Sequence, residues 1–288
     1  MSDLLSGLGS LGLGSLQGME LFEENKPEDA AGKAEEAVVV VDETDFLIEK
    51  TYECPICGRK FKVLMPKTGK SKLMSTDMDL RPVHEHVDLT KYDVIVCQNC
   101  GYAVLSRYHA GLAERQKKAI LEKISQNYKS NTEKYTTYSY EDALARYQLA
   151  LVNAIVKQAK NSEKAYICLK AGWLMRGYSE WLLTEEGQKT ENAKEKREQV
   201  LKMEDEYLRN AFEGFQSAMS SELFPIAGMD ESTMNYLLAV LAYRFDKLEI
   251  AGPLVSKILI SPSVSTRTKD KTRDLKDLIV AKLKERKN

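Results

Sequence analysis

The chain has 288 residues, of which 43% are hydrophobic and 30% charged, and its formal net charge is −1. This composition is typical of a folded, helix-rich protein, and a chain of this length favours two domains plus a tail. No apolar stretch approaches the length of a transmembrane helix, and the near-neutral net charge excludes a globally basic nucleic-acid-binding surface. Because the N-terminus lacks the basic region of a signal peptide and carries Asp3, the sequence predicts a cytoplasmic protein without a membrane segment.

The N-terminal residues differ from the rest in charge. Residues 1–45 carry a net charge of −9, whereas residues 46–110 carry +3 and residues 111–288 carry +5. Residues 1–45 therefore predict a disordered acidic tail. Its first part, 1–18, is rich in Leu, Gly and Ser, and it either belongs to the disordered tail or folds on a partner.

Two Cys-x-x-Cys-Gly motifs follow, at 54–58 and 97–101. Two residues between the cysteines let both sulfur atoms reach one metal ion from a tight turn. In a reducing compartment such pairs favour metal binding over disulfides. A thioredoxin-like redox pair and an iron–sulfur centre are the alternatives. The preferred prediction is one structural, tetrahedral Zn²⁺ whose ligands are Cys54, Cys57, Cys97 and Cys100.

Strand-like runs at 61–65 and 92–96 adjoin the two motifs, and together they predict a small β-rich zinc ribbon over 46–110. A basic stretch lies between the motifs, with no acidic residue from 59 to 76. It suggests a contact site for nucleic acid or for an acidic partner, and a solvated loop is the alternative. The basic residues are Arg59, Lys60, Lys62, Lys67, Lys70 and Lys72.

A second polar cluster follows the basic stretch. It consists of Asp77, Asp79, His84 and His86. These side chains could bind a further divalent ion and take part in acid–base catalysis. Alternatively they form a polar loop in which the aspartates pair with Arg81.

From residue 111 onward apolar residues recur at helical spacing, which predicts a helical domain over 111–288. The expected helices lie at 112–128, from 139 past 155, at 166–181, through 200–218, and near 231–245, 249–260 and 268–286. Ser139 and Asp142 suggest a capping box. The face expected to point inward on the helix that follows carries Leu144, Tyr147, Leu151 and Ile155.

The segment 238–255 resembles the tetratricopeptide pattern, in which small residues let two helices approach closely. Pro253 departs from this pattern, since proline is tolerated only in the first turn of a helix. The predicted fold class is therefore α+β, mainly α, with a small β-rich zinc ribbon followed by a tetratricopeptide-like domain of α-helical hairpins. Four aromatic residues, Tyr166, Trp173, Trp181 and Tyr207, suit a helical core better than a peptide groove. Cys168 is expected to be buried.

Three stretches of the chain resemble an uncharacterised bacterial family, domain of unknown function 2225. They are FLIEKTYECPICGRKF (46–61), Asp79-Leu-Arg-Pro82 and YDVIVCQNCGYA (92–103). The resemblance covers 46–285 and implies metal binding through the same four cysteines, but it implies no reaction. Gln98 stands where the family more often has proline, a departure that leaves both sulfur atoms in place.

No glycine-rich phosphate loop, G-x-S-x-G elbow or H-E-x-x-H motif occurs, so we expect neither enzymatic activity nor a small-molecule substrate. The preferred hypothesis is a zinc-binding adaptor or scaffold that binds a protein partner. The second hypothesis is a nucleic-acid-binding regulator that uses the basic stretch 59–72. The third is a metalloenzyme that uses the second polar cluster.

Overall fold

The structure is a computed structural model that describes residues 42–130 and 133–286, all of which belong to one unit of the chain. Nearly all of the predicted acidic tail, including the Leu/Gly-rich segment, lies outside the described residues. The described part begins at Asp42, whose side chain caps a short 3-10 helix, Glu43–Phe46.

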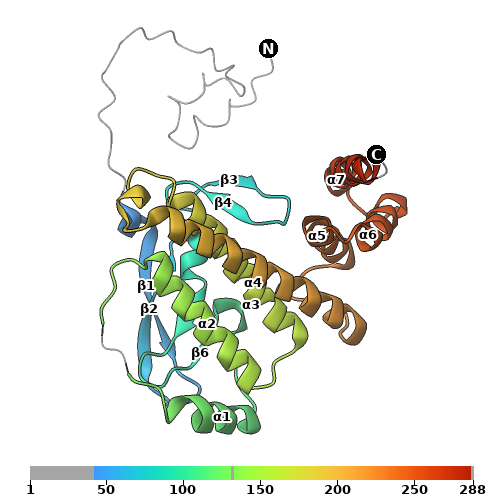
Figure 1. The fold of residues 1–288 in the computed structure, drawn as a ribbon. Coiled ribbons are helices and arrows are strands. Elements are labelled where there is room, and N and C mark those ends of the chain that lie inside the picture. Colours follow the sequence, from blue (N-terminus) through green and yellow to red (C-terminus); the bar gives the residue numbers. More distant parts are fainter. Residues whose placement is uncertain (1–41, 131–132, 287–288) are drawn as a thin grey trace, which may run out of the picture. The chain divides into compact units, whose positions relative to one another are not determined.

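Six short strands in the described residues form three separate antiparallel hairpins (Figure 1). They are β1 (Leu47–Glu53) with β2 (Lys60–Pro66), β3 (Leu73–Thr76) with β4 (Pro82–His84), and β5 (Val94–Val96) with β6 (Ala103–Leu105). The β1–β2 hairpin pairs Leu47 with Pro66 and Glu53 with Lys60, so that its turn consists of the first cysteine motif. The β5–β6 hairpin encloses the second motif in the same way.

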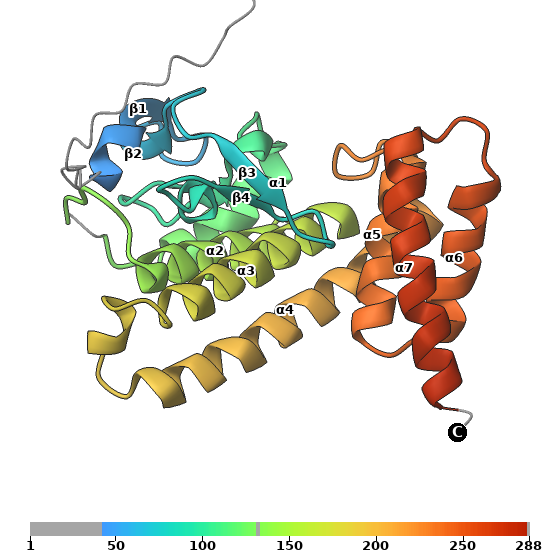
Figure 2. The same cartoon turned by 90° about the horizontal axis from the view of Figure 1, so that it is seen from above.

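Helices make up most of the remaining described residues, which confirms the prediction of an α+β fold that is mainly α. They are α1 (Glu114–Ile120), α2 (Tyr140–Val156), α3 (Asn161–Trp181), α4 (Ala193–Ser221), α5 (Glu231–Arg244), α6 (Leu248–Ile260) and α7 (Thr266–Glu285). No helix in the described segments is both long and apolar enough to cross a membrane. Figure 2 shows α5, α6 and α7 packed beside the C-terminal end of α4.

Local sequence signals account for several helix boundaries. Ser139 and Asp142 form the predicted capping box at the start of α2, in which the Asp142 N–H donates to the Ser139 hydroxyl at 3.0 Å. Asp230 and Ser265 cap α5 and α7 in the same manner. The helix expected near 249–260 is α6, which begins at Leu248 and continues through Pro253.

The β5–β6 hairpin is buried on both faces and connects two hydrophobic clusters. Side chains alternate across a strand. On one face Val94 and Val96 pack with residues of α2 and α3, whereas on the other Ile95 packs with the cysteines and with α1. The strands of the segment 46–110 and the first long helices are therefore in direct contact. The division of the chain at residue 110 stays a prediction.

The inward face of α2 differs from the expected one. Tyr147 is buried as predicted, but Ile155 is exposed, and the contacts with the hairpin are made largely by the small residues Ala143, Ala150 and Ala154. A third cluster forms among α3 to α7. The tetratricopeptide-like character of these helices stays a prediction.

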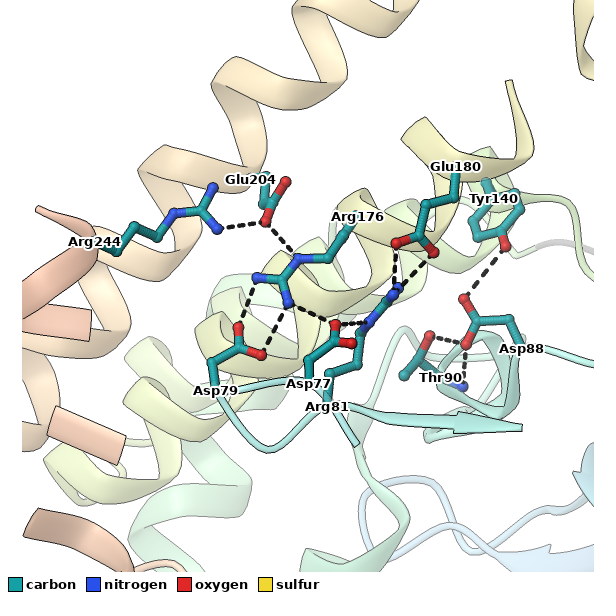
Figure 3. Close-up of polar contacts among 10 residues, drawn as sticks. All are labelled: Asp77, Asp79, Arg81, Asp88, Thr90, Tyr140, Arg176, Glu180, Glu204 and Arg244. Carbon is teal, nitrogen blue, oxygen red and sulfur yellow. Dashed lines mark hydrogen bonds and ion pairs between the residues drawn. The ribbon is translucent and has the colours of Figure 1, made fainter. Parts of the chain in front are cut away.

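A network of charged side chains holds the β3–β4 hairpin against the helices (Figure 3). The guanidinium of Arg176 on α3 binds both oxygens of Asp79, at 2.9 and 2.6 Å, and also Asp77 at 2.8 Å. Its Nε donates to Glu204 on α4 at 2.8 Å, and Arg244 on α5 binds the same oxygen of Glu204 at 2.9 Å. One arginine therefore joins the hairpin tip to two helices.

Arg81 extends this network from the other side of the hairpin tip. Its Nε donates to Asp77 at 2.7 Å, and its Nη2 donates to Glu180 on α3 at 2.6 and 2.8 Å. Burial alone would raise the pKa of Asp77, but hydrogen bonds from Arg176 and Arg81 outweigh it and hold that pKa below its usual value. Asp77 is therefore charged within the network at neutral pH.

Replacing Arg176 with methionine should strongly destabilise the fold. Asp79 is only 4% exposed and has Arg176 as its sole ion-pair partner among the described residues, so the substitution leaves a buried carboxylate unpaired. We expect the free energy of unfolding to fall by about 3–5 kcal/mol, measured by urea denaturation followed by circular dichroism. In the matched control, Arg273→Met, the lost ion pair with Asp270 is exposed, and the expected change is within about 0.5 kcal/mol. Equal losses in the two variants would contradict a special role for Arg176.

Candidate metal centre

The two cysteine motifs have the same backbone geometry at the ends of their hairpins. In the first, the Cys54 N–H donates to the carbonyl of Arg59 at 3.0 Å, and the Gly58 N–H donates to the carbonyl of Cys54 at 2.9 Å. The equivalent hydrogen bonds starting from Cys97 measure 2.8 and 2.9 Å. Each motif is therefore a tight knuckle that turns its two sulfur atoms toward the other hairpin.

Glycine is required at the fifth position of each knuckle because the backbone there is left-handed. Gly58 has a φ of +67° and Gly101 a φ of +73°. The two positions differ in their surroundings. A Cβ added at Gly58 would meet no atom within 4 Å, whereas one at Gly101 would lie 2.6 Å from the ring of Tyr128. The second knuckle is therefore covered by an aromatic ring and the first is open.

The four cysteine sulfur atoms lie together, as the sequence predicts. All four are within 4.8 Å of one another, with Cys54 and Cys100 at 3.5 Å and Cys57 and Cys97 at 3.8 Å. Metal–sulfur bonds of about 2.3 Å in a tetrahedron place neighbouring sulfur atoms about 3.8 Å apart. The arrangement can therefore hold one metal ion.

The surroundings of the sulfur atoms make an ion-free tetrathiolate unfavourable. Hydrogen bonding to Cys54 and Cys97, followed by burial, raises the pKa of Cys100 above its usual value. Four sulfur atoms at these separations, three of them on buried cysteines, cannot all lose their protons without a cation to stabilise the negative charge. Metal binding would therefore release protons from this cluster.

Asn153 on α2 connects the second knuckle to the helices. Its side chain is 1% exposed, and its Nδ2 donates to the carbonyl of Gly101 and to that of Leu149, both at 2.9 Å. Sequence reasoning missed this residue. The available signal was a single amide within the otherwise apolar stretch 149–156, because a buried polar side chain requires a partner.

The second polar cluster does not form a metal site in the described residues. Among the described residues, only the four cysteines form a group with metal-ligand geometry. Asp77 and Asp79 bind Arg81 and Arg176 instead, in the network of Figure 3. This matches the alternative interpretation of a polar loop whose aspartates pair with Arg81.

The predicted basic stretch is divided between two environments. Arg59, Lys60 and Lys62 line one groove together with two basic residues from later in the chain. Lys67 donates from its Nζ to the carbonyl of Asp45 at 2.9 Å. The remaining two residues, Lys70 and Lys72, are exposed and lie outside this groove.

The aromatic residues of the helices are largely packed inside. Trp173 is buried in the core formed by α3 to α7, and Tyr166, Trp181 and Tyr207 are partly buried against hydrophobic clusters. Trp181 also lines a cleft of about 290 Å³ beside the β3–β4 hairpin. Cys168 is buried as expected, and burial raises the pKa of its thiol to about 11.

Two paired cysteine knuckles on β-hairpins, followed by packed helices, define an α+β protein with a four-cysteine cluster that could hold a metal ion. Residues 47–279 match the family described as "Uncharacterized protein conserved in bacteria (DUF2225)". The chain belongs to this family, which confirms the resemblance found from the sequence. Neither a protein of curated function nor a solved structure gives a significant match.

Adding a methyl group at the two knuckle glycines should have unequal effects. Gly58→Ala introduces only the cost of a left-handed alanine, about 1–2 kcal/mol. Gly101→Ala carries the same cost and also requires the Tyr128 ring to move, so its loss of stability should be clearly larger. Thermal unfolding of the metal-loaded variants measures the difference. A Gly58→Ala protein that is equally or more destabilised would contradict the packing of Tyr128 on the second knuckle.

Removing one sulfur ligand should abolish tight metal binding. Cys100→Ser should reduce the metal content, measured by inductively coupled plasma mass spectrometry, from one ion per chain to near zero. The control is Cys168→Ser, which removes a buried thiol outside the cluster and should retain the metal. Retention of the ion by Cys100→Ser, or its loss from Cys168→Ser, would contradict the assignment of the four ligands.

Proposed function

We propose that this chain is a non-enzymatic, cytoplasmic zinc-binding adaptor in which one Zn²⁺ has a structural role and the helices bind a protein partner. The observation that carries the structural role is the closed ligand set. Four cysteines would occupy all four coordination positions of a tetrahedral ion, so no position remains for a substrate. Zinc is the proposed metal because four thiolates in a tetrahedron suit it well.

The proposed ion would act on the helices through the β5–β6 hairpin. This hairpin ends in the second knuckle, and its two faces contact the cysteine cluster and α2. Asn153 adds a direct hydrogen bond from α2 to the knuckle backbone. Fixing the knuckle therefore favours one position of α2, and α2 packs on α3. This is how a metal site without chemistry of its own would support a binding surface.

The two most exposed large hydrophobic side chains among the described residues adjoin α5 and α6 in the sequence, and they support partner contacts by this part of the chain. Leu223, which precedes α5, is 92% exposed, and Ile260, the last residue of α6, is 81% exposed. The start of α5 and the end of α6 line one cleft of about 310 Å³. Helical hairpins of the tetratricopeptide type commonly bind peptides, and this part of the proposal is an analogy with that fold.

The adaptor function is tested by capture from a native lysate, with the full-length, zinc-loaded chain as bait. We expect a protein partner whose recovery saturates as the bait concentration rises. The bait Leu223→Glu/Ile260→Glu should lose that partner because a charged side chain then replaces each of the two exposed apolar ones. The control bait, Leu183→Glu/Leu121→Glu, changes two exposed side chains elsewhere and should retain it. Recovery of no saturable partner by the parent chain would overturn the adaptor function.

A further inference from the structure

A groove of about 1010 Å³ lies beside the first hairpin and is called the ribbon groove below. Its walls are the β1–β2 hairpin, the second knuckle, residues 133–138 and the side chain of Arg146 on α2. Five basic side chains line it, against the two acidic side chains of Glu49 and Glu133, which gives a net charge of +3. The basic residues are Arg59, Lys60, Lys62, Lys134 and Arg146.

Arg146 is a mostly buried cation without an acidic partner. It forms no ion pair among the described residues, and its Nη1 is buried there without a hydrogen-bond partner. Its guanidinium lies 3.8 Å from the ring centroid of Tyr138 and 5.7 Å from that of Tyr135. Burial lowers the pKa of Arg146 from its usual value. A partly buried guanidinium with no ion-pair partner among the described residues is a favourable place for an incoming carboxylate.

Two of the basic side chains of the groove, those of Lys60 and Lys62, are regularly spaced along β2. Lys60 and Lys62 are two residues apart on one strand, so they project from the same face of the hairpin, and both are exposed. Residues i and i+2 of an extended strand, whose side chains lie on the same face, are about 6.7 Å apart. An extended peptide with acidic residues at alternate positions presents carboxylates at the same interval.

We infer that the ribbon groove binds an acidic, extended peptide segment of the protein partner. Carboxylates of the segment would contact Lys60 and Lys62 along the hairpin, at Lys62 in exchange for its exposed ion pair with Glu49 at 2.7 Å. Arg146 would bind one carboxylate at the inner end of the groove. This inference deepens the proposed adaptor function and rests on it, because it specifies the chemistry of the partner.

The aromatic residues of the groove favour a peptide over single-stranded nucleic acid. Nucleic-acid grooves combine cations with free ring faces on which bases stack. Here Tyr138 is buried beneath Arg146, and Tyr135 packs edge-on against Tyr138 at 5.3 Å. Phe61 lies 6.2 Å from the ring of Tyr52. The rings of Tyr135 and Tyr138 are engaged with each other and with Arg146, so the described part of the groove favours charged contacts over base stacking.

The test uses fluorescence anisotropy with the full-length, metal-loaded chain at about 0.1 M salt, where charges more than about 10 Å apart are screened. The probe is a fluorescein-labelled peptide of about ten residues in which glutamate alternates with serine, an extended length that spans the hairpin. A matched peptide carries glutamine in place of glutamate. We expect saturable binding of the glutamate peptide and binding at least about tenfold weaker for the glutamine peptide.

Two double variants separate the groove from general electrostatics. Lys60→Glu/Lys62→Glu reverses two charges inside the groove and should weaken binding by about tenfold or more. Lys70→Glu/Lys72→Glu makes the same change in charge on exposed residues outside the groove, and its affinity should stay within about twofold of the parent. Circular dichroism checks that each variant is folded, which is expected because all four side chains are exposed.

The inference is overturned by any of three results. They are equal binding of the glutamine peptide, equal weakening by the two double variants, or tighter binding of a labelled oligothymidylate, which would assign the groove to nucleic acid. Its failure is distinguishable from failure of the adaptor function. If peptide binding fails while lysate capture still depends on Leu223 and Ile260, the groove is wrong and the adaptor stands. If capture fails while the peptide binds, the adaptor function is wrong and the groove remains only an anion-binding site.

Discussion

The fold depends on the contact between two hairpin ends that are far apart in the sequence. Thirty-nine residues separate Cys57 from Cys97, yet their sulfur atoms lie 3.8 Å apart. Closing a loop of this length costs about 3 kcal/mol in chain entropy. Thiols alone offer only weak hydrogen bonds against that cost, whereas a structural zinc ion contributes about 10–16 kcal/mol in comparable sites. The proposed ion is therefore the simplest physical reason for the two hairpins to stay together.

The β3–β4 hairpin has a different kind of attachment, because its tip is held by charge. Arg176 binds Asp77 and Asp79 on the hairpin and Glu204 on α4, and Arg81 returns from the hairpin to Glu180. Desolvating so many charges offsets much of their attraction, so the network is weak evidence for added stability. Its geometry does restrict the arrangement, since a planar guanidinium satisfies three carboxylates in few positions. We therefore interpret the network as fixing where the hairpin lies on α3 and α4.

Features encoded within a few neighbouring residues could be predicted from the sequence, whereas contacts between distant residues could not. The knuckles were predictable because two residues between cysteines, followed by glycine, encode a turn within five positions. The start of α2 was predictable from Ser139 and Asp142 for the same reason. The ion pair of Asp79 with Arg176 was not predictable. The two residues are 97 positions apart, and the sequence around Arg176 does not indicate a buried acid as its partner. Ile155 was misplaced because helical periodicity identifies a face without showing what packs on it.

The basic stretch illustrates this limit most clearly. In the sequence, residues 59–72 carry six basic side chains and no acidic one, which predicts that all six lie on a single contact surface. The turn after β2 separates that run, so that Lys60 and Lys62 stay on the strand while Lys70 and Lys72 leave it. The groove gains its other two basic residues, Lys134 and Arg146, and the rings of Tyr135 and Tyr138 from a later segment that ends on α2. A surface built from two distant segments can have a ligand preference that neither segment carries alone, and the ring that Arg146 covers favours the inferred carboxylate ligand over bases.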